Sequence, residues 1–155
     1  MSDTPLRLGR FLPYRLSFTS NLVSEMIASR YGALFGLTIP EWRLIAVIAE
    51  QGAISQQAIC QITRMDKVSV SRAAIALAER ELVTRSPNPD DKRSHLLGLS
   101  PIGRDLYENI APRAMAMESR IFACLTPDER ASLGALLDRV DAHATAMLGS
   151  GEAAG

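Results

Sequence analysis

Apolar residues recur at helical spacing along most of this chain, and one stretch shows the pattern most clearly. Between Asp66 and about Glu81, the apolar positions fall three or four residues apart on one helical face: Val70, Ala73, Ala74 and Leu77. The opposite face is small and polar and carries Arg72. Asp66 is a good N-cap because its carboxylate can accept hydrogen bonds from first-turn N–H groups. The pattern therefore predicts an amphipathic helix with one buried face.

Two short strand-like runs follow this helix and enclose a polar loop. The runs are Leu82–Arg85 and His95–Leu99. The loop, Pro87–Arg93, contains two prolines, which fix φ and remove hydrogen-bond donors. The sequence therefore predicts a β-hairpin with Lys92 and Arg93 at its tip.

Further helices are predicted on both sides of this region. Their starts are indicated by an N-cap residue or a first-turn proline: Pro13, Thr38, Ser55, Ser100 and Thr126. Thr38 and Thr126 are each followed three residues later by glutamate, which is the spacing of a capping box. The first helix is expected to run to about Tyr31 and to be broken by Gly32 and Gly36, and Pro112 is expected to kink the helix that contains it.

In sequence order, a short helix, a tight turn, a second helix and a hairpin make up a winged helix-turn-helix. The expected fold is thus mainly α with a small β-hairpin wing. We expect one domain over residues 11–148. Within it, the winged helix-turn-helix unit at about 38–100 is called the reading head. The helices at about 11–31 and 101–148 carry wide apolar stripes, which suit an intertwined dimer. Residues 1–10 are expected to form a flexible arm and residues 149–155 a disordered tail.

Composition adds a charge pattern that fits this organisation. The 155 residues carry no net charge, but residues 60–104 hold eight Lys and Arg against five Asp and Glu. Residues 105–155 hold four against eight, so the basic excess lies on the expected reading head. There is no signal peptide and no apolar run long enough to span a bilayer, which predicts a cytoplasmic protein with no membrane partner.

Double-stranded DNA is the partner that these features predict. A helix with a small polar face can enter a major groove, where Arg72 could reach guanine or phosphate and Val68 a thymine methyl. Arg93 on the wing suits a narrow minor groove, and Asp91 is expected to brace it. The full set of expected DNA-binding residues is Gln56, Gln57, Lys67, Val68, Ser69, Ser71, Arg72, Lys92 and Arg93.

The hairpin and the segments before it resemble the MarR family of winged-helix transcription regulators. The family's D-x-R…L-x-L-[ST]-x-x-G signature is matched by Asp91, Arg93, Leu97, Leu99, Ser100 and Gly103. Upstream, Ser69–Arg72, Leu82–Val83 and Leu37–Trp42 also match, and the resemblance covers roughly residues 8–148. It implies DNA binding as a homodimer. In the resemblance, the helix from Asp66 to about Glu81 is the recognition helix that contacts DNA. One departure is Glu81, which stands where the family usually has glycine, so this helix is expected to end differently here.

The resemblance also implies a pocket for a small aromatic or anionic effector. The candidates to line it are Tyr14, Arg15, Phe18, Trp42 and Arg43. Packing is the preferred interpretation of Phe18 and Trp42, and Arg15 and Arg43 are the better candidates because a cation would select a carboxylate. A second question concerns Cys60, one of two cysteines, which lies among apolar residues and is expected to be buried and inert. The redox-sensing members of the family carry their reactive cysteine near the start of the first helix, and this chain has none before position 60.

No catalytic, metal or cofactor motif is found in the sequence. His95 and His143 have no cysteine or histidine at ligand spacing, and neither a phosphate-binding glycine loop nor a nucleophile elbow is present. The sequence gives no case for an enzyme, and the family resemblance implies a homodimeric, ligand-responsive repressor that binds a pseudo-palindromic operator. The alternatives are a winged-helix module that binds protein and a regulator that senses redox state through cysteine.

Overall fold

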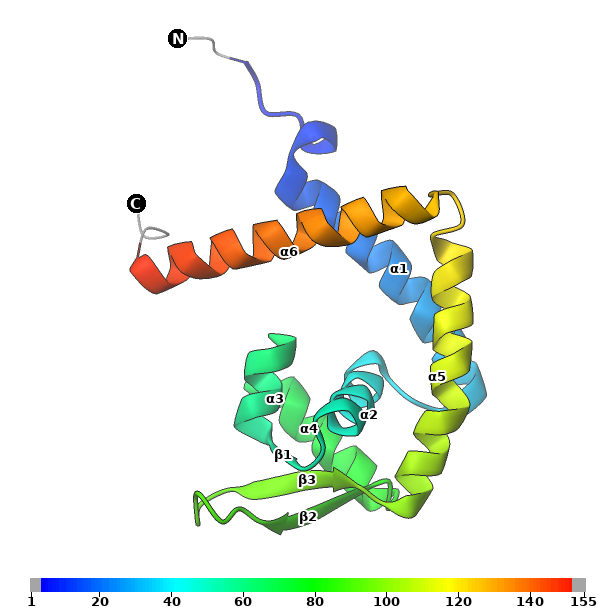
Figure 1. Ribbon diagram of the computed structural model, residues 1–155, viewed down its shortest axis with the longest axis vertical. Coiled ribbons are helices and arrows are strands. Elements are labelled where there is room, and N and C mark those ends of the chain that lie inside the picture. The colour runs from blue at the N-terminus through cyan, green and yellow to red at the C-terminus, as the bar shows by residue number, and fades with distance from the viewer. Residues whose placement is uncertain (1–3, 152–155) are drawn as a thin grey trace. The chain divides into compact units, whose positions relative to one another are not determined.

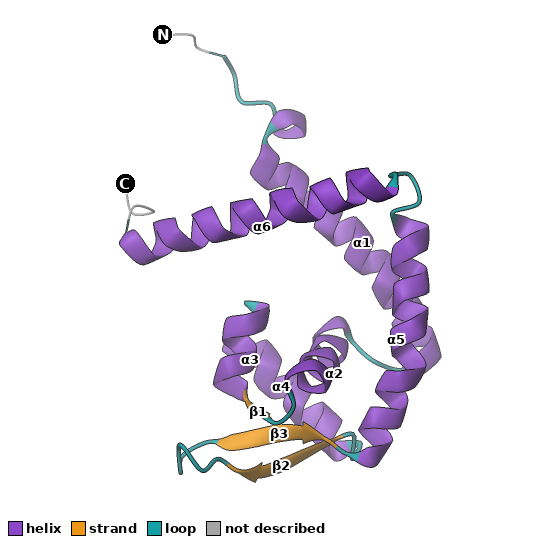
Figure 2. Ribbon diagram, in the orientation of Figure 1, coloured by secondary structure: helices purple, strands orange, loops and turns teal. Residues whose placement is uncertain are grey.

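The computed structural model describes residues 4–151 and shows a mainly helical protein with a small sheet (Figures 1 and 2). Its elements, in chain order, are a 3₁₀ turn η1 Leu8–Arg10, α1 Leu12–Phe35, α2 Ile39–Gln51, β1 Ile54–Ser55, α3 Gln56–Thr63, α4 Lys67–Glu79, β2 Val83–Pro87, β3 His95–Leu99, α5 Pro101–Ile121 and α6 Pro127–Ser150. This order confirms the predicted winged helix-turn-helix. The chain falls into two compact units, Met1–Ala114 and Met115–Gly155, and the boundary between them lies within α5.

The predicted N-caps are present and explain where several helices begin. In the α2 capping box, the Glu41 backbone N–H donates to Thr38 Oγ1 at 3.3 Å, and the Thr38 N–H donates to the Glu41 carboxylate at 3.1 Å. An equivalent box starts α6, with distances of 3.1 and 2.8 Å. Ser55 Oγ accepts from the Ala58 N–H at 3.2 Å and so caps α3.

The ends of the terminal helices differ from the expectation. Gly32 does not end α1, which continues to Phe35 and stops where Gly36 takes the left-handed conformation at φ 61°. A glycine inside a helix costs only about 1 kcal/mol relative to alanine, which the neighbouring turns can outweigh. Part of the expected flexible arm forms η1, and α6 includes the first two residues of the expected tail. Residues 1–3 and 152–155 lie outside the described residues.

The sheet is antiparallel, with strand order β1-β3-β2. β2 and β3 form the predicted hairpin, in which Val83 pairs with Leu99 and Pro87 with His95. The two-residue β1, which was not predicted, pairs Ile54 with Leu97. Because β1 immediately precedes α3, this pairing ties the start of the helix-turn-helix to the hairpin (Figure 2).

The core lies within the reading head. Its buried side chains come from the loop before α2, from α2, β1, α3, α4, the hairpin and α5: Leu37, Leu44, Ile45, Ile48, Ile54, Ile59, Val70, Ala73, Ala74, Leu77, Leu82, Val83, Leu97 and Ile110. The four apolar positions predicted to share the inner face of α4 all belong to this set.

Hydrogen bonds of Ser100 join the residues after α4 to the start of α5. Ser100 Oγ donates to the Glu81 carbonyl at 2.6 Å and accepts from the Gly103 N–H at 2.9 Å. The Ser100 N–H donates to the Leu82 carbonyl at 3.1 Å. Gly103 is buried against this carbonyl, and a Cβ at position 103 would overlap its oxygen. The Ser100 and Gly103 positions of the motif therefore have a structural role.

Glu81 takes a left-handed backbone conformation, which glycine adopts without strain. Its φ is 58°, in the left-handed region, although α4 itself ends at Glu79. The expected change in how the helix ends is therefore not observed. A side chain in this region carries a steric cost that glycine avoids.

Gly103→Ala should destabilise the protein by about 1–3 kcal/mol, because the added methyl group meets backbone atoms that other contacts hold in place. Thermal or urea unfolding followed by circular dichroism measures the change. Gly149→Ala is the matched control, since no heavy atom lies within 4 Å of the added Cβ, and its stability should change by less than about 0.5 kcal/mol. Equal effects of the two substitutions would contradict the proposed overlap.

Glu81→Gly should stabilise the protein by about 0.5–1 kcal/mol, because relief of left-handed strain exceeds the entropy that glycine gains in the unfolded chain. Glu81→Ala removes the same carboxylate but keeps Cβ, so it should give no comparable gain. A gain from alanine as large as that from glycine would show that charge, not backbone strain, is relieved. Urea unfolding of the three proteins decides this.

Candidate DNA-binding site

The turn between α3 and α4 is held by the side chain of Thr63. Thr63 Oγ1 donates to the Ile59 carbonyl at 2.7 Å and accepts from the Met65 N–H at 3.2 Å. Arg64 between them adopts a left-handed conformation with φ 54°. Together these features reverse the chain over the three residues Arg64–Asp66, so that α4 follows α3 directly.

Asp66 starts α4 as predicted. Its Oδ1 accepts from the Ser69 backbone N–H at 2.8 Å, and its Oδ2 accepts from the Ser69 hydroxyl at 2.7 Å. The bond from the Ser69 N–H, followed by that from its hydroxyl, lowers the pKa of the Asp66 carboxyl. The cap is therefore ionised at neutral pH. The Asp66 carboxylate also accepts the hydrogen bond of the Ser69 hydroxyl, and Ser69 is one of the expected DNA-binding residues.

The outer face of α4 and the start of α3 form a shallow depression. Its volume is about 400 Å³, and it is lined by Gln56, Lys67, Val68, Ser71 and Arg72. Five of the expected DNA-binding residues are thus brought together. The amide, hydroxyl, ammonium and guanidinium groups in this set can all donate hydrogen bonds to phosphates or base edges. Val68 lies among them with 57% of its surface exposed, as expected for an apolar contact with a base.

Cys60 lies closer to this face than the sequence indicated. It is half-buried and not fully buried as expected, because it packs against the core on one side and lines two further depressions on the other. One, of about 420 Å³, also includes Gln57 and Lys67. The other, of about 350 Å³, includes Arg64. Arg64 was not among the predicted residues, because its exposure near the site follows from the turn and not from helical periodicity.

The wing loop is ordered by two side chains that bond to nearby backbone. Asn88 Oδ1 accepts from the Asp90 N–H at 3.0 Å, and Asn88 Nδ2 donates to Ser94 Oγ at 2.9 Å. Asp91 Oδ1 accepts from the Arg93 N–H at 2.9 Å. Asp91 was expected to brace the Arg93 guanidinium, but the bond shown here is to its backbone. The reason is local: an aspartate side chain reaches the N–H two residues ahead within an Asx turn.

Lys92 and Arg93 are exposed in this loop, and they line none of the three depressions described above. The loop projects beyond the helices of the reading head (Figure 1). The wing cations and the α4 face are therefore separate surfaces of one unit. The role of Asn88 was not predicted from the sequence. Asparagine in a turn commonly forms an Asx turn, in which its side chain accepts from the backbone N–H two residues ahead, and this signal could have identified it.

The expected effector residues form two groups. Tyr14 and Phe18 lie on α1 with ring centroids 6.1 Å apart, and both are exposed. Trp42 on α2 stacks on Tyr107 of α5 at a centroid distance of 6.1 Å and packs against the core. Arg15 and Arg43 are exposed. These five residues line none of the depressions described above, and their role in ligand binding stays a prediction.

Over residues 4–151, no helix is both long enough and apolar enough to cross a membrane. Within the same range, no group of three or more His, Cys, Asp or Glu side chains is arranged to hold a metal ion.

Comparisons with known sequences agree with this geometry. Residues 35–94 match the model of the MarR family. A putative transcriptional regulatory protein for the hcr operon of Thauera aromatica is 29% identical over 68% of this chain and 63% of its own length. The multiple antibiotic resistance protein MarR of Salmonella typhimurium is 25% identical over 90% of this chain and 99% of its own length. The transcriptional repressor NicR of Pseudomonas putida is 27% identical over 67% and 66%.

Solved structures resemble almost the whole chain. A MarR/EmrR family regulator from Acinetobacter sp. ADP1 has a TM-score of 0.84 at 25% identity, covering 92% of this chain and 100% of that one. A probable transcriptional regulator from Pseudomonas aeruginosa has a TM-score of 0.76 at 30% identity, covering 86% and 99%. BpsR of Bordetella bronchiseptica, whose DNA binding is regulated by 6-hydroxynicotinic acid, has a TM-score of 0.81 at 25% identity, covering 89% and 98%. The chain belongs to the MarR family of winged helix-turn-helix, DNA-binding transcriptional regulators, which are not enzymes.

Proposed function

We propose that the protein is a homodimeric, ligand-responsive repressor that binds a pseudo-palindromic operator. The observation that supports a homodimer is that large apolar side chains are exposed along the two terminal helices, α1 and α6. On α1 and the residue before it, the exposed set is Phe11, Leu12, Tyr14, Leu16, Phe18, Leu22 and Met26. On α6, it is Leu133, Leu136, Leu137, Val140, Met147 and Leu148. Apolar surface of this extent is typical of a protein interface.

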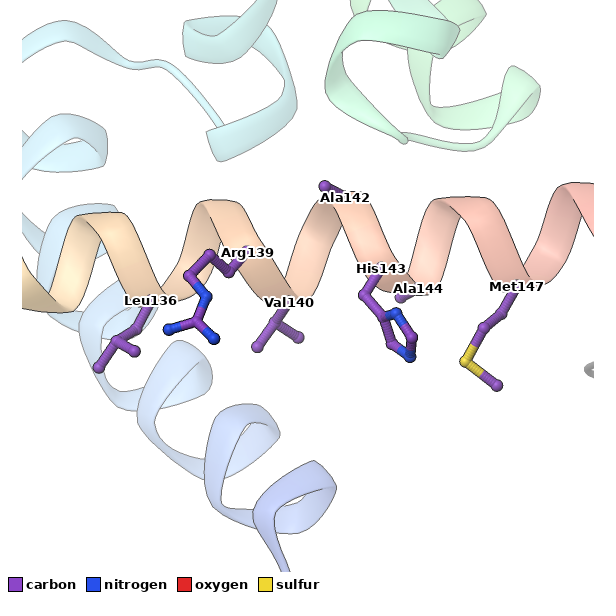
Figure 3. A pocket seen from close by; sticks show the side chains of 7 residues that line it. All are labelled: Leu136, Arg139, Val140, Ala142, His143, Ala144 and Met147. Carbon is purple, nitrogen blue, oxygen red and sulfur yellow. The ribbon is translucent and has the colours of Figure 1, made fainter.

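Figure 3 shows the apolar surface of α6 in detail. A shallow, open depression of about 760 Å³ lies along this helix and is lined mainly by apolar side chains (Figure 3). Leu136, Val140, His143 and Met147 project from the same side of the helix, and Ala142 projects from the opposite side. Such a stripe on a helix favours packing against another helix.

A two-fold dimer explains how the shallow α4 face could give specific binding. Two α4 helices related by the axis would enter successive major grooves about 34 Å apart. Each would supply the Gln56, Lys67, Val68, Ser71 and Arg72 set to one half-site. The function also implies a cytoplasmic location, because that is where chromosomal DNA is available to a bacterial regulator.

Ligand response and repression rest on similarity to relatives. BpsR responds to 6-hydroxynicotinic acid, an aromatic acid, and NicR is a repressor. In this chain, the exposed aromatic pair Tyr14 and Phe18 on α1 and the cations Arg15 and Arg43 are the groups that suit an aromatic anion. Contact with a ring and a carboxylate is the chemistry they offer.

Arg72→Ala should lower the ratio of operator affinity to non-specific affinity, because a bidentate Arg–guanine contact contributes about 1–3 kcal/mol of discrimination. Arg93→Ala should weaken both kinds of binding and lower the salt slope by about one charge, because the wing acts through phosphate and minor-groove potential. Binding curves at several salt concentrations, on an operator and a scrambled duplex, measure both effects.

The operator for this experiment is selected from DNA that flanks the protein's own coding region. If Arg93→Ala affects only the operator and Arg72→Ala affects both duplexes equally, the two roles are reversed. If the unmodified protein binds no duplex selectively, the protein-binding module becomes the better interpretation.

Val140→Lys should dissociate the dimer, because it places a charge in the apolar stripe of α6, where the wild-type side chain is 53% exposed in the single chain. Asp141→Lys, at the next position, is the matched control and should leave the dimer intact. Light scattering gives the molar mass of each variant. A dimer that persists in Val140→Lys and is lost in Asp141→Lys would place the interface elsewhere on α6.

A further inference from the structure

One arginine joins the ends of two helices that are far apart in sequence. Arg80 directly follows α4, and its backbone N–H donates to the Ala76 carbonyl at 3.3 Å. Its guanidinium reaches the end of α1, where Nη1 donates to the Gly36 carbonyl at 3.0 Å and Nη2 to the Phe35 carbonyl at 3.2 Å. The residue that ends the recognition helix α4 is therefore also bonded to the last carbonyls of α1.

The end of α1 is a suitable acceptor for this cation. The final carbonyls of a helix have no intrahelical partners and carry negative partial charge, yet α1 has no basic residue in its own last turn. A second arginine also approaches from another element, since Arg113 Cζ of α5 lies 5.5 Å from the centroid of the Phe35 ring. The Phe35–Gly36 junction thus receives one arginine from α4 and one from α5.

The α1 side chains that the structure describes make few apolar contacts with the reading head. Among the α1 side chains that the structure describes, none is buried, and those that pack against the core are Ile27 and Phe35. Apolar contacts are not directional, whereas a planar guanidinium with two donors fixes the positions of two acceptors. The Arg80 contact is therefore well suited to set the direction in which α1 leaves the head.

We infer that Arg80 is a positioning residue for DNA recognition, because its two hydrogen bonds to the end of α1 fix the angle between α1 and the recognition helix. The inference rests on the proposed dimer, in which α1 contributes apolar surface to the interface. In such a dimer, the angle between α1 and α4 determines the distance between the two copies of α4. Arg80 sets this distance without contacting DNA itself.

Full-length protein is tested on its operator, on a scrambled duplex, and on operators whose half-sites are one base pair closer together or further apart. Arg80→Ala should weaken operator binding roughly 5- to 30-fold, a typical range for coupling between sites. Binding to the scrambled duplex should change less than about twofold, because it depends on the charges that contact phosphate. The variant should also lose much of the preference for the natural half-site spacing.

Two further variants control this experiment. Arg80→Lys keeps a cation but not the two-donor plane, so its operator affinity and spacing preference should fall between those of the wild type and Arg80→Ala. Arg120→Ala removes the same charge from an exposed position on α5 and should behave as the wild type. Circular dichroism and light scattering confirm that each variant is folded and dimeric.

Equal losses on the operator and the scrambled duplex would make Arg80 a DNA contact and overturn the inference. A folded, dimeric Arg80→Ala protein with unchanged operator affinity and spacing preference would also overturn it. If Arg80→Ala does not fold, Arg80→Lys decides by the same criteria. If the wild type itself shows no operator preference, the proposed function fails, and the inference that depends on it fails with it.

Discussion

The reading head depends on three hydrogen bonds that Ser100 makes to Glu81, Leu82 and Gly103. Through them, this residue at the end of the hairpin contacts Glu81 and Leu82, shortly after the recognition helix, and the first turn of α5. Ser100 is only 7% exposed, and burial of its polar groups is tolerable because each of them has a partner. The hairpin is closed at its base by the same bonds. The start of α5, the register of the wing and the end of α4 are consequently determined together.

Sequence patterns predicted the parts of this fold that are determined locally. The caps at Thr38, Asp66 and Thr126, and the buried face of α4, each depend on residues within one or two helical turns. The candidate site was predictable to the same extent, since side chains on one face of α4 must lie together. A motif match further indicated that Ser100 and Gly103 matter, although not what they contact.

The features that were not predicted depend on distant parts of the chain. The pairing of β1 with β3 involves residues 54 and 97, and a two-residue strand leaves no periodic pattern. The Arg80 contact spans 44 residues. The helix α1 passes through Gly32 and ends before Gly36. A glycine alone does not specify which of two such positions ends a helix. Local sequence offered several acceptable outcomes in these places, and tertiary contacts selected one.

In the proposed complex, the hydrogen bonds of Asn88 and Asp91 lower the entropic cost of placing the wing on DNA. A mobile loop loses conformational freedom when it is fixed on a ligand, and each ordered residue carries a free-energy cost. In this protein, the backbone of the wing loop is already constrained by side chains of the loop itself, without glycine at its tip. Much of that ordering occurs when the protein folds. A protein with a net charge of zero cannot rely on strong general attraction to DNA, and in the proposed complex a preformed wing would allow more of its limited contact energy to appear as affinity.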